Sequence, residues 1–343
     1  MFPMQVFWSE HQLRHEGARF LKAGRLIASP ESPARARSIL AALSDADFRI
    51  TEPEDHGLEP LMRVHPAAYL EFLQRIHSRW ITAFGHDAAV LPNVMAGVQR
   101  SHVPESPVGA LGYYVGDLAA EIREGTWAAS YASAQCAVGA ARYMVATGNP
   151  AYALCRPPGH HAGAARAMGF CFLNNAAIAA EELRQRFAKV AIVDIDVHCG
   201  NGTQSIFYER SDVLTASMHS NPSHYYPFHS GYEDEQGAGE GRGANTNVCY
   251  SADVDDAGFL EAFARLTDAV EAFAPEAIVL ALGVDALRSD PHGGHHITPD
   301  AFAEVAARLR SWGLPTIFVQ EGGYDSDELG PTVARVLRVF SDE

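Results

Sequence analysis

Short apolar runs rich in valine and isoleucine alternate with longer helical stretches along this chain, and this alternation constrains its fold most strongly. The clearest apolar runs cover residues 190–196, 213–219, 277–285 and 315–320. Residues 176–187 and 256–273 instead carry apolar positions three and four apart, which is the period of a helix. Strands that alternate with helices predict an α/β fold with a central parallel sheet flanked by helices on both faces. In such folds ligands bind at the carboxyl ends of the strands.

The 343 residues contain no clear boundary between independent units. The one stretch rich in proline and serine, residues 102–107, is short and adjoins helical sequence, so it is better interpreted as a loop than as a linker. A chain of this length can bury one large core. We therefore predict a single domain over residues 1–343.

The formal net charge of −16 at pH 7 narrows the classes of partner. Nucleic-acid-binding surfaces carry an excess or a cluster of lysine and arginine, so we expect no nucleic-acid partner. An acidic protein suits a neutral or cationic small molecule, although most acidic surfaces serve solubility.

Cysteine usage and the N-terminal sequence predict a cytoplasmic protein. The five cysteines are scattered and lack a CxxC spacing, which favours reduced thiols over disulfides or a thiolate metal site. Glu10 is reached before any apolar stretch is long enough for a signal peptide. Because no apolar run approaches the length of a membrane span, we also expect no association with a membrane.

Acidic and imidazole side chains gather at the ends of two apolar runs. Asp196 and His198 lie two residues apart, so in an extended chain they point the same way, with Asp194 behind them on that face. Asp285 ends the run of residues 277–285. Two carboxylates and one imidazole leave a coordination position open, as catalytic zinc sites do. The alternative is that these carboxylates only cap neighbouring helices and turns.

Two further segments carry groups suited to acid–base chemistry. His160 and His161 are adjacent at the end of a loop rich in proline and glycine, and a pair in such a loop favours acid–base chemistry over a structural role. Tyr324 follows a Gly-Gly turn after the run of residues 315–320. Standing alone, this tyrosine would be an ordinary aromatic residue after a turn.

Together, six segments resemble the zinc-dependent histone deacetylase superfamily, in the same order along the chain. They are Arg156-Pro157-Pro158-Gly159-His160-His161, Gly169-Phe170-Cys171-Phe172-Leu173-Asn174-Asn175, Asp194-Ile195-Asp196-Val197-His198, Gly200-Asn201-Gly202-Thr203, Leu282-Gly283-Val284-Asp285 and Glu321-Gly322-Gly323-Tyr324. Six ordered matches are hard to obtain by chance. The resemblance implies the arginase/deacetylase-like fold and a deacetylase that hydrolyses a linear amide C–N bond.

Within this superfamily the chain is most similar to the bacterial acetylpolyamine amidohydrolases. The similarity rests on Ser9-Glu10-His11, Gly112-Tyr113-Tyr114, Gly125-Thr126-Trp127, Gln204-Ser205-Ile206-Phe207-Tyr208 and the long segment of residues 83–125. In that branch the inserted segment narrows the substrate channel and helps to form a homodimer. The resemblance therefore implies an insertion at residues 83–125, a homodimer and a small acetylated amine as substrate.

The resemblance also implies the role of each matching residue. Asp196, His198 and Asp285 would bind one zinc ion per chain, which polarises the amide carbonyl and acidifies a bound water. Tyr324 would donate a hydrogen bond to the oxyanion, a contact worth about 3 kcal/mol or more of barrier in other enzymes.

The two histidines would differ in role. His161 would be the general base and then the acid that protonates the leaving amine, whereas His160, oriented by Asp194, would act electrostatically. In the family's arrangement His161 faces Asn201. Because a carboxylate favours imidazolium and an amide does not, we expect His161 to be the easier of the two to keep neutral at pH 7.

Structural potassium is implied beside the zinc. Its ligands would be Asp194, the Ser217 hydroxyl and backbone carbonyls of Asp196, His198 and Met218. A second ion would rest on carbonyls near Phe207, Arg210 and Val213.

Four positions match the family's substrate tunnel. Phe170 and Tyr226 would sandwich the aliphatic chain of the substrate, Gly169 would let that chain approach the backbone, and His292 falls at another tunnel position. For Phe170 and Tyr226 the alternative is ordinary core packing.

The sequence departs from the family pattern at three positions. Cys199 stands where the family has a second histidine, although neighbouring strand residues point to opposite sides and this change should not touch the zinc chemistry. Val108 and Ala119 replace the acidic residues that meet the cationic amine in the best-known polyamine branch. Nearby acidic residues that could substitute are Glu105, Asp117 and Glu121.

Three functions therefore stay open. The first is a small-molecule amidohydrolase for acetylated polyamines, similar N-acetyl amines or another small amide, which the inserted segment favours. The second is a protein or peptide lysine deacetylase, which needs a wider channel mouth. The third is a catalytically silent binding module, which the full set of ligands and catalytic residues disfavours. An arginase with two bridged metal ions lacks the paired carboxylate cluster that such a site needs.

Overall fold

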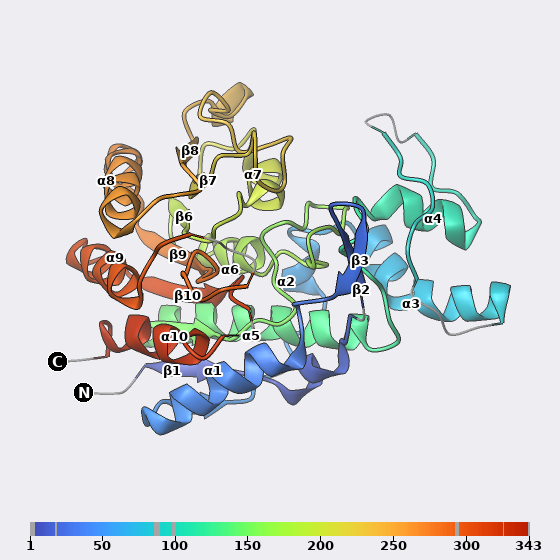
Figure 1. The fold of residues 1–343 in the computed structure, drawn as a ribbon, viewed down its shortest axis with the longest axis horizontal. Coiled ribbons are helices and arrows are strands. Elements are labelled where there is room, and N and C mark those ends of the chain that lie inside the picture. The colour runs from blue at the N-terminus through green and yellow to red at the C-terminus, as the bar shows by residue number, and fades with distance from the viewer. Residues whose placement is uncertain are drawn as a thin grey trace.

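The structure is a computed structural model that describes residues 4–17, 19–85, 90–97, 101–291, 295–324 and 326–341. Within these ranges eight strands form one parallel sheet (Figure 1). Their order across the sheet is β4 (Arg49–Thr51), β1 (Gln5–Phe7), β5 (Ala151–Ala153), β10 (Thr316–Gln320), β9 (Ala277–Leu282), β6 (Val190–Asp194), β7 (Val213–Ser220) and β8 (Asn245–Tyr250). The predicted α/β fold with a central parallel sheet is confirmed.

Both faces of this sheet are buried, because its inner strands carry apolar residues at nearly every position. In β9, Ile278 and Leu280 join one hydrophobic core, whereas Val279 and Ala281 join the other. This alternation follows from the two-residue period of a strand.

Helices cover both faces of the sheet. One core contains side chains of α2 (Glu59–Met62), α3 (Ala67–Phe84), α4 (Pro107–Tyr114), α5 (Thr126–Thr147) and α6 (Asn175–Leu183). The other contains side chains of α1 (Pro33–Asp45), α8 (Asp256–Phe273), α9 (Pro299–Ser311) and α10 (Leu329–Arg338). The chain thus folds into three layers, with the sheet in the middle (Figure 1).

The predicted strands are present, but two of them end earlier than the apolar runs do. β6 stops at Asp194 and β9 stops at Leu282. Beyond the end of β6, the Ile195 N–H still donates to the Ala281 carbonyl of β9, but the next two N–H groups donate to carboxylates. The Asp196 N–H donates to Asp194 Oδ1 at 3.1 Å, and the Val197 N–H donates to Asp285 Oδ1 at 3.0 Å.

The two predicted helices are also present. Residues 256–273 form α8 with the expected bounds, and the stretch at 176–187 forms α6, which ends at Leu183 and passes into a turn. None of the described helices combines the length and apolar character needed to cross a membrane.

Several short elements lie outside the main sheet and its long helices. An antiparallel hairpin of β2 (Arg19–Lys22) and β3 (Arg25–Ala28) stands apart from the main sheet (Figure 1). The short helix α7 (Asn201–Phe207) follows β6, and 3₁₀ turns cover Glu10–Arg14 and Gly239–Gly241. The described part of residues 83–125 contains α4 and lies on the side of the molecule away from both termini (Figure 1).

Candidate metal centre and active site

Asp196, His198 and Asp285 come together at the carboxyl edge of the sheet. Asp196 and His198 follow β6, and Asp285 follows the neighbouring strand β9. One potential ligand atom from each residue lies within 4.8 Å of the others. Both carboxylates are fully buried, and His198 is partly exposed. The chain therefore gathers two oxygen donors and one nitrogen donor around a single point.

Two glycines leave room for the paired carboxylates. A Cβ atom at Gly283 would overlap the side chain of Asp196, and one at Gly322 would overlap both Asp196 and Asp285. The Gly322 N–H also donates to Asp196 Oδ2 at 2.8 Å. A larger residue at either position would push the carboxylates apart.

The chemistry of the cluster fits a metal cation. Among the described residues, Asp285 Oδ2 is buried without a hydrogen bond, and His198 Nδ1 lies 3.2 Å from it and 3.0 Å from Asp196 Oδ1. A buried oxygen of this kind is costly unless a cation or donor completes it. Burial acts to lower the pKa of His198, but the nearby carboxylates of Asp196 and Asp285 outweigh burial and raise this pKa to about 9. The site thus attracts positive charge with the donor types that catalytic zinc uses.

His160 and His161 reach this site from the loop after β5. Their ring centroids lie 4.0 Å apart, and the His161 ring lies 5.7 Å from that of His198. His160 Nδ1 is 2.9 Å from Asp194 Oδ2, and His161 Nδ1 is 2.7 Å from Asn201 Oδ1. One imidazole therefore faces a carboxylate and the other faces an amide.

These partners give the two imidazoles opposite charge preferences. Burial acts to lower the pKa of His160, but the charges of Asp196 and Asp194 outweigh it and raise this pKa well above its usual value. Burial lowers the pKa of His161 well below its usual value, and the charges of His160 and His198 lower it further. The site favours imidazolium at His160 and neutral imidazole at His161.

A buried carboxylate holds the backbone of the histidine loop. Glu321, at the end of β10, accepts hydrogen bonds from the N–H groups of Gly159 at 2.6 Å and His160 at 2.9 Å. Burial raises the pKa of Glu321 to about 7. Sequence reasoning found Glu321 within a motif but assigned it no role, because only the fold brings the end of β10 beneath the loop after β5.

Tyr324 enters the site from the loop after β10. Its N–H donates to Asp290 Oδ2 at 2.7 Å, and the Arg35 guanidinium carbon lies 4.8 Å from its ring centroid. Arg35 also donates to the carbonyl oxygens of Gly323 and Glu321, the latter at 2.5 Å. The sequence carries no signal for Arg35, because this residue lies in α1, far from Tyr324 along the chain.

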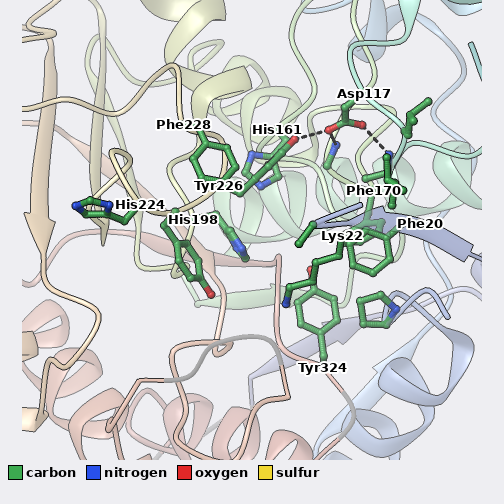
Figure 2. A pocket seen from close by; sticks show the side chains of 17 residues that line it. Phe20, Lys22, Asp117, His161, Phe170, His198, His224, Tyr226, Phe228 and Tyr324 are labelled. Atoms are coloured by element: carbon green, nitrogen blue, oxygen red, sulfur yellow. Dashed lines mark hydrogen bonds between the residues drawn. The ribbon is translucent and has the colours of Figure 1, made fainter. Parts of the chain in front are cut away.

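A cavity of about 560 Å³ lies next to His161, His198 and Tyr324. Figure 2 shows His161, His198 and Tyr324 around it, with Phe20, Phe170 and Phe228 among its aromatic walls. The lining comes from the hairpin β2–β3, the segment after α4, the turn at Gly169 and the segment of residues 224–228. Because most of these side chains are apolar or aromatic, the cavity suits an aliphatic chain with a polar group at its metal end.

Gly169 and Phe170 form a tight turn in the cavity wall. Both have left-handed backbones, with φ of 56° and 66°. A Cβ atom at Gly169 would overlap the His161 ring and lie 2.8 Å from the Tyr226 hydroxyl, so glycine is required there. The turn holds the Phe170 ring 5.3 Å from that of Phe20 and 6.2 Å from that of Tyr324, measured between centroids.

Most of the other residues singled out from the sequence also lie near this centre. Asp194 and Ser217 are register partners on β6 and β7 and line a small internal cavity, and Met218 is the next buried residue of β7. Tyr226 lines the main cavity, with its ring centroid 4.9 Å from that of His161. His292 lies outside the described residues.

Comparisons with known proteins identify the family of this chain. Residues 29–340 match the histone deacetylase domain. The chain is 41% identical to acetylpolyamine amidohydrolase 1 of Pseudomonas aeruginosa over 98% of both chains. It is 39% identical to the acetylpolyamine amidohydrolase of Mycoplana ramosa over 98% of this chain and 99% of that protein. This chain belongs to the histone deacetylase family.

Two solved structures of related proteins resemble this chain over nearly its whole length. The crystal structure of an acetylpolyamine aminohydrolase from Burkholderia pseudomallei superposes with a TM-score of 0.94, at 38% identity over 99% of both chains. The HD domain of HDA15 superposes with a TM-score of 0.81, at 28% identity over 99% of this chain and 90% of that chain. The predicted arginase/deacetylase-like fold and deacetylase class are confirmed, and family membership implies a zinc-dependent hydrolase.

Proposed function

We propose that this histone deacetylase family member removes acetyl groups from acetylated polyamines or similar small N-acetyl amines. One observation carries the proposal: the three-residue cluster and the low-pKa imidazole of His161 lie together at a cavity with mainly apolar and aromatic walls. The names of the relatives from Pseudomonas aeruginosa and Mycoplana ramosa support this substrate class.

Asp196, His198 and Asp285 would hold one zinc ion per chain. When bound, zinc supplies a Lewis acid that polarises the amide carbonyl and acidifies a water molecule. The glycines at positions 283 and 322 keep the two carboxylates close enough to share a cation.

His161 moves the proton in the proposed reaction. Its lowered pKa keeps the ring unprotonated at neutral pH, so it can accept a proton from the attacking water. The same ring then donates that proton to the nitrogen of the leaving amine, and acetate and the free amine are released. His160 keeps a positive charge beside the reacting groups, because Asp194 and Asp196 stabilise its imidazolium.

Tyr324 stabilises the oxyanion by donating a hydrogen bond from its hydroxyl. Burial raises the pKa of this hydroxyl well above its usual value, so it remains a donor over the working pH range. The Asp290 and Arg35 contacts described above fix the backbone and ring of Tyr324 for this task.

Two accessory features belong to the same proposal. Asp194 and Ser217 would bind a structural potassium ion, which their adjacency on paired strands supports. The single domain would include residues 83–125 as an insertion that shapes the channel and forms a homodimer interface. Support for the channel role is that Asp117, Leu118 and Ala119 line the cavity.

Steady-state kinetics of the zinc-loaded protein would test the proposal. The substrates are N-acetylputrescine, N-acetylcadaverine and a peptide with an internal acetyl-lysine, with Tyr324→Phe as the control variant. We expect kcat/KM for the acetylated diamines to exceed that for the peptide by orders of magnitude. Loss of the oxyanion donor should lower kcat roughly a hundredfold or more.

Each result has a defined meaning. Preference for the peptide would replace the small-amine proposal with protein deacetylation. Activity that Tyr324→Phe leaves unchanged would remove this tyrosine from the mechanism.

A further inference from the structure

The carboxylate of Asp117 ties three segments of the cavity wall together. Asp117 Oδ2 accepts hydrogen bonds from the Tyr226 hydroxyl at 2.6 Å and from the Gly169 N–H at 3.0 Å. Asp117 Oδ1 accepts from the N–H groups of Ala119 at 3.0 Å and Ala120 at 3.2 Å. Figure 2 shows Asp117 beside the cavity, joined by dashed lines to Tyr226 and to the turn that carries Phe170.

These four hydrogen bonds use the acceptor capacity of the side chain. An ionised carboxylate has about four lone-pair positions on its two oxygens, and four donors from the protein occupy them here. An ammonium group of a substrate could approach Asp117 only by displacing one of these donors. Asp117 is also the one aspartate or glutamate among the described residues that line the cavity.

The two donors to Asp117 Oδ2 belong to the two aromatic walls, whereas the Ala119 and Ala120 N–H groups belong to the segment of Asp117 itself. The Gly169 N–H is part of the turn at Gly169 and Phe170, in which the left-handed backbone of Phe170 is costly unless its surroundings hold it. Hydrogen bonds between Met168 and Cys171, at 3.1 and 2.9 Å, close this turn. Asp117 Oδ2 holds this turn through the Gly169 N–H. The same oxygen accepts from the Tyr226 hydroxyl and so fixes the Tyr226 ring.

We propose that Asp117 is a positioning residue that sets the spacing between the Phe170 and Tyr226 walls, and that it does not bind the distal ammonium of the substrate. This inference rests on the proposed deacetylation of small N-acetyl amines. It deepens that function, because the walls held by Asp117 select substrates by the fit of their aliphatic chain. Changing Asp117 therefore impairs charged and uncharged acetylamides alike.

A matched pair of substrates tests this directly. N-acetylputrescine carries a distal ammonium, and N-butylacetamide has the same four-carbon chain without it. For Asp117→Asn we expect kcat/KM to fall roughly tenfold or more on both substrates, mainly through KM, with little change in their ratio. A loss confined to N-acetylputrescine would overturn the proposal and make Asp117 the ammonium receptor.

The chain offers a control with the same chemistry outside the cavity. Asp55 accepts hydrogen bonds from the Tyr131 hydroxyl and from the Gly57 N–H, and it does not line the channel. Asp55→Asn should leave kcat/KM on both substrates near the wild-type value. An equal loss in Asp55→Asn would show that the effect of Asp117→Asn is not specific to the channel, which would also overturn the proposal.

Thermal unfolding separates this inference from the proposed function. Asp117→Asn should lower Tm by about 2 °C or more, because a carboxylate with four protein donors contributes to the folded state without any substrate. Tyr226→Phe should also lower Tm, and the double variant should lose less than the sum of the two, since both changes remove the same hydrogen bond. If the wild type hydrolyses neither substrate, the proposed function fails. The Tm values of the two single variants and the double variant would still test the positioning role of Asp117. Additive Tm losses would overturn it.

Discussion

At the scale of single residues, the different roles proposed for His160 and His161 depend on which side chain lies next to each Nδ1 atom. Asp194 lies 2.9 Å from His160, and Asn201 lies 2.7 Å from His161. If a carboxylate replaced the amide of Asn201, imidazolium would be stabilised on His161 as well as on His160. The neutral amide of Asn201 therefore leaves His161 able to accept a proton near neutral pH.

Asn201→Asp tests this assignment through the pH dependence of the rate. The new carboxylate should raise the pKa of His161, so the base would remain protonated up to a higher pH. We expect the acidic limb of the kcat profile to move to higher pH and the rate at pH 7 to fall. Tyr324→Phe is the control, because it should lower the rate without moving that limb. An unmoved acidic limb in Asn201→Asp would contradict the role of His161.

Glu321 makes a second prediction at this scale, because burial raises the pKa of its carboxyl from 4.5 to about 7. Between these values the folded state binds more protons than the unfolded state, so the contribution of Glu321 to stability falls as pH rises. The full difference corresponds to at most about 3 kcal/mol. Glu321→Gln keeps an oxygen that can accept from Gly159 and His160 and removes the charge. We therefore expect the variant to lose less stability than the wild type between pH 5 and pH 8.

Urea unfolding at these two pH values and one zinc concentration measures that difference. Glu304→Gln provides an exposed control, in which wild type and variant should respond to pH alike. The same gap between wild type and Glu321→Gln at pH 5 and pH 8 would argue against a buried, proton-linked Glu321.

At the scale of elements, apolar runs predict the inner strands well because both faces of the sheet are buried. The residues that follow β6 could be predicted as ligands, since Asp196 and His198 share one face of an extended chain. The hairpin β2–β3 could not be predicted in this way, because its residues are mostly exposed and lack the pattern of a buried strand. Only the fold brings this hairpin over the cavity, where Phe20 meets Phe170.

Phe20→Ala tests whether the hairpin takes part in substrate binding. The edge-to-face contact between Phe20 and Phe170 is of a kind worth about 0.5–1.5 kcal/mol, so we expect kcat/KM to fall about 2- to 12-fold. The change should appear in KM, because Phe20 lies on the wall and not beside the catalytic histidines. Leu26→Ala is the matched control on β3, where Leu26 is 63% exposed and outside the cavity lining. A fall in kcat at constant KM would contradict a binding role for the hairpin.

At the scale of the whole molecule, the site collects residues from nearly the full length of the chain, from Phe20 to Tyr324. The ligands could be predicted because each follows a recognisable strand and parallel strands end at one edge of the sheet. Hydrogen bonds between distant parts of the chain could not be predicted, because no local sequence pattern links the two partners. Examples are the bond from Arg35 to the Glu321 carbonyl and the bond from the Tyr226 hydroxyl to Asp117. The contacts that hold the site residues in place therefore depend on the topology of the fold as much as on local sequence motifs.

Zinc binding should couple this centre to the stability of the entire fold, because the ligands follow the neighbouring strands β6 and β9. A metal that binds only the folded state stabilises it by about 2.7 kcal/mol at a free concentration one hundred times Kd. We expect zinc to raise the Tm of the metal-stripped protein, and Asp285→Asn to lose most of that rise. Asparagine keeps an acceptor for the Val197 N–H at this position, so the loss would reflect the missing charge. Tyr324→Phe should keep the full rise while losing activity. A zinc-dependent rise that persists in Asp285→Asn would show that the metal binds elsewhere.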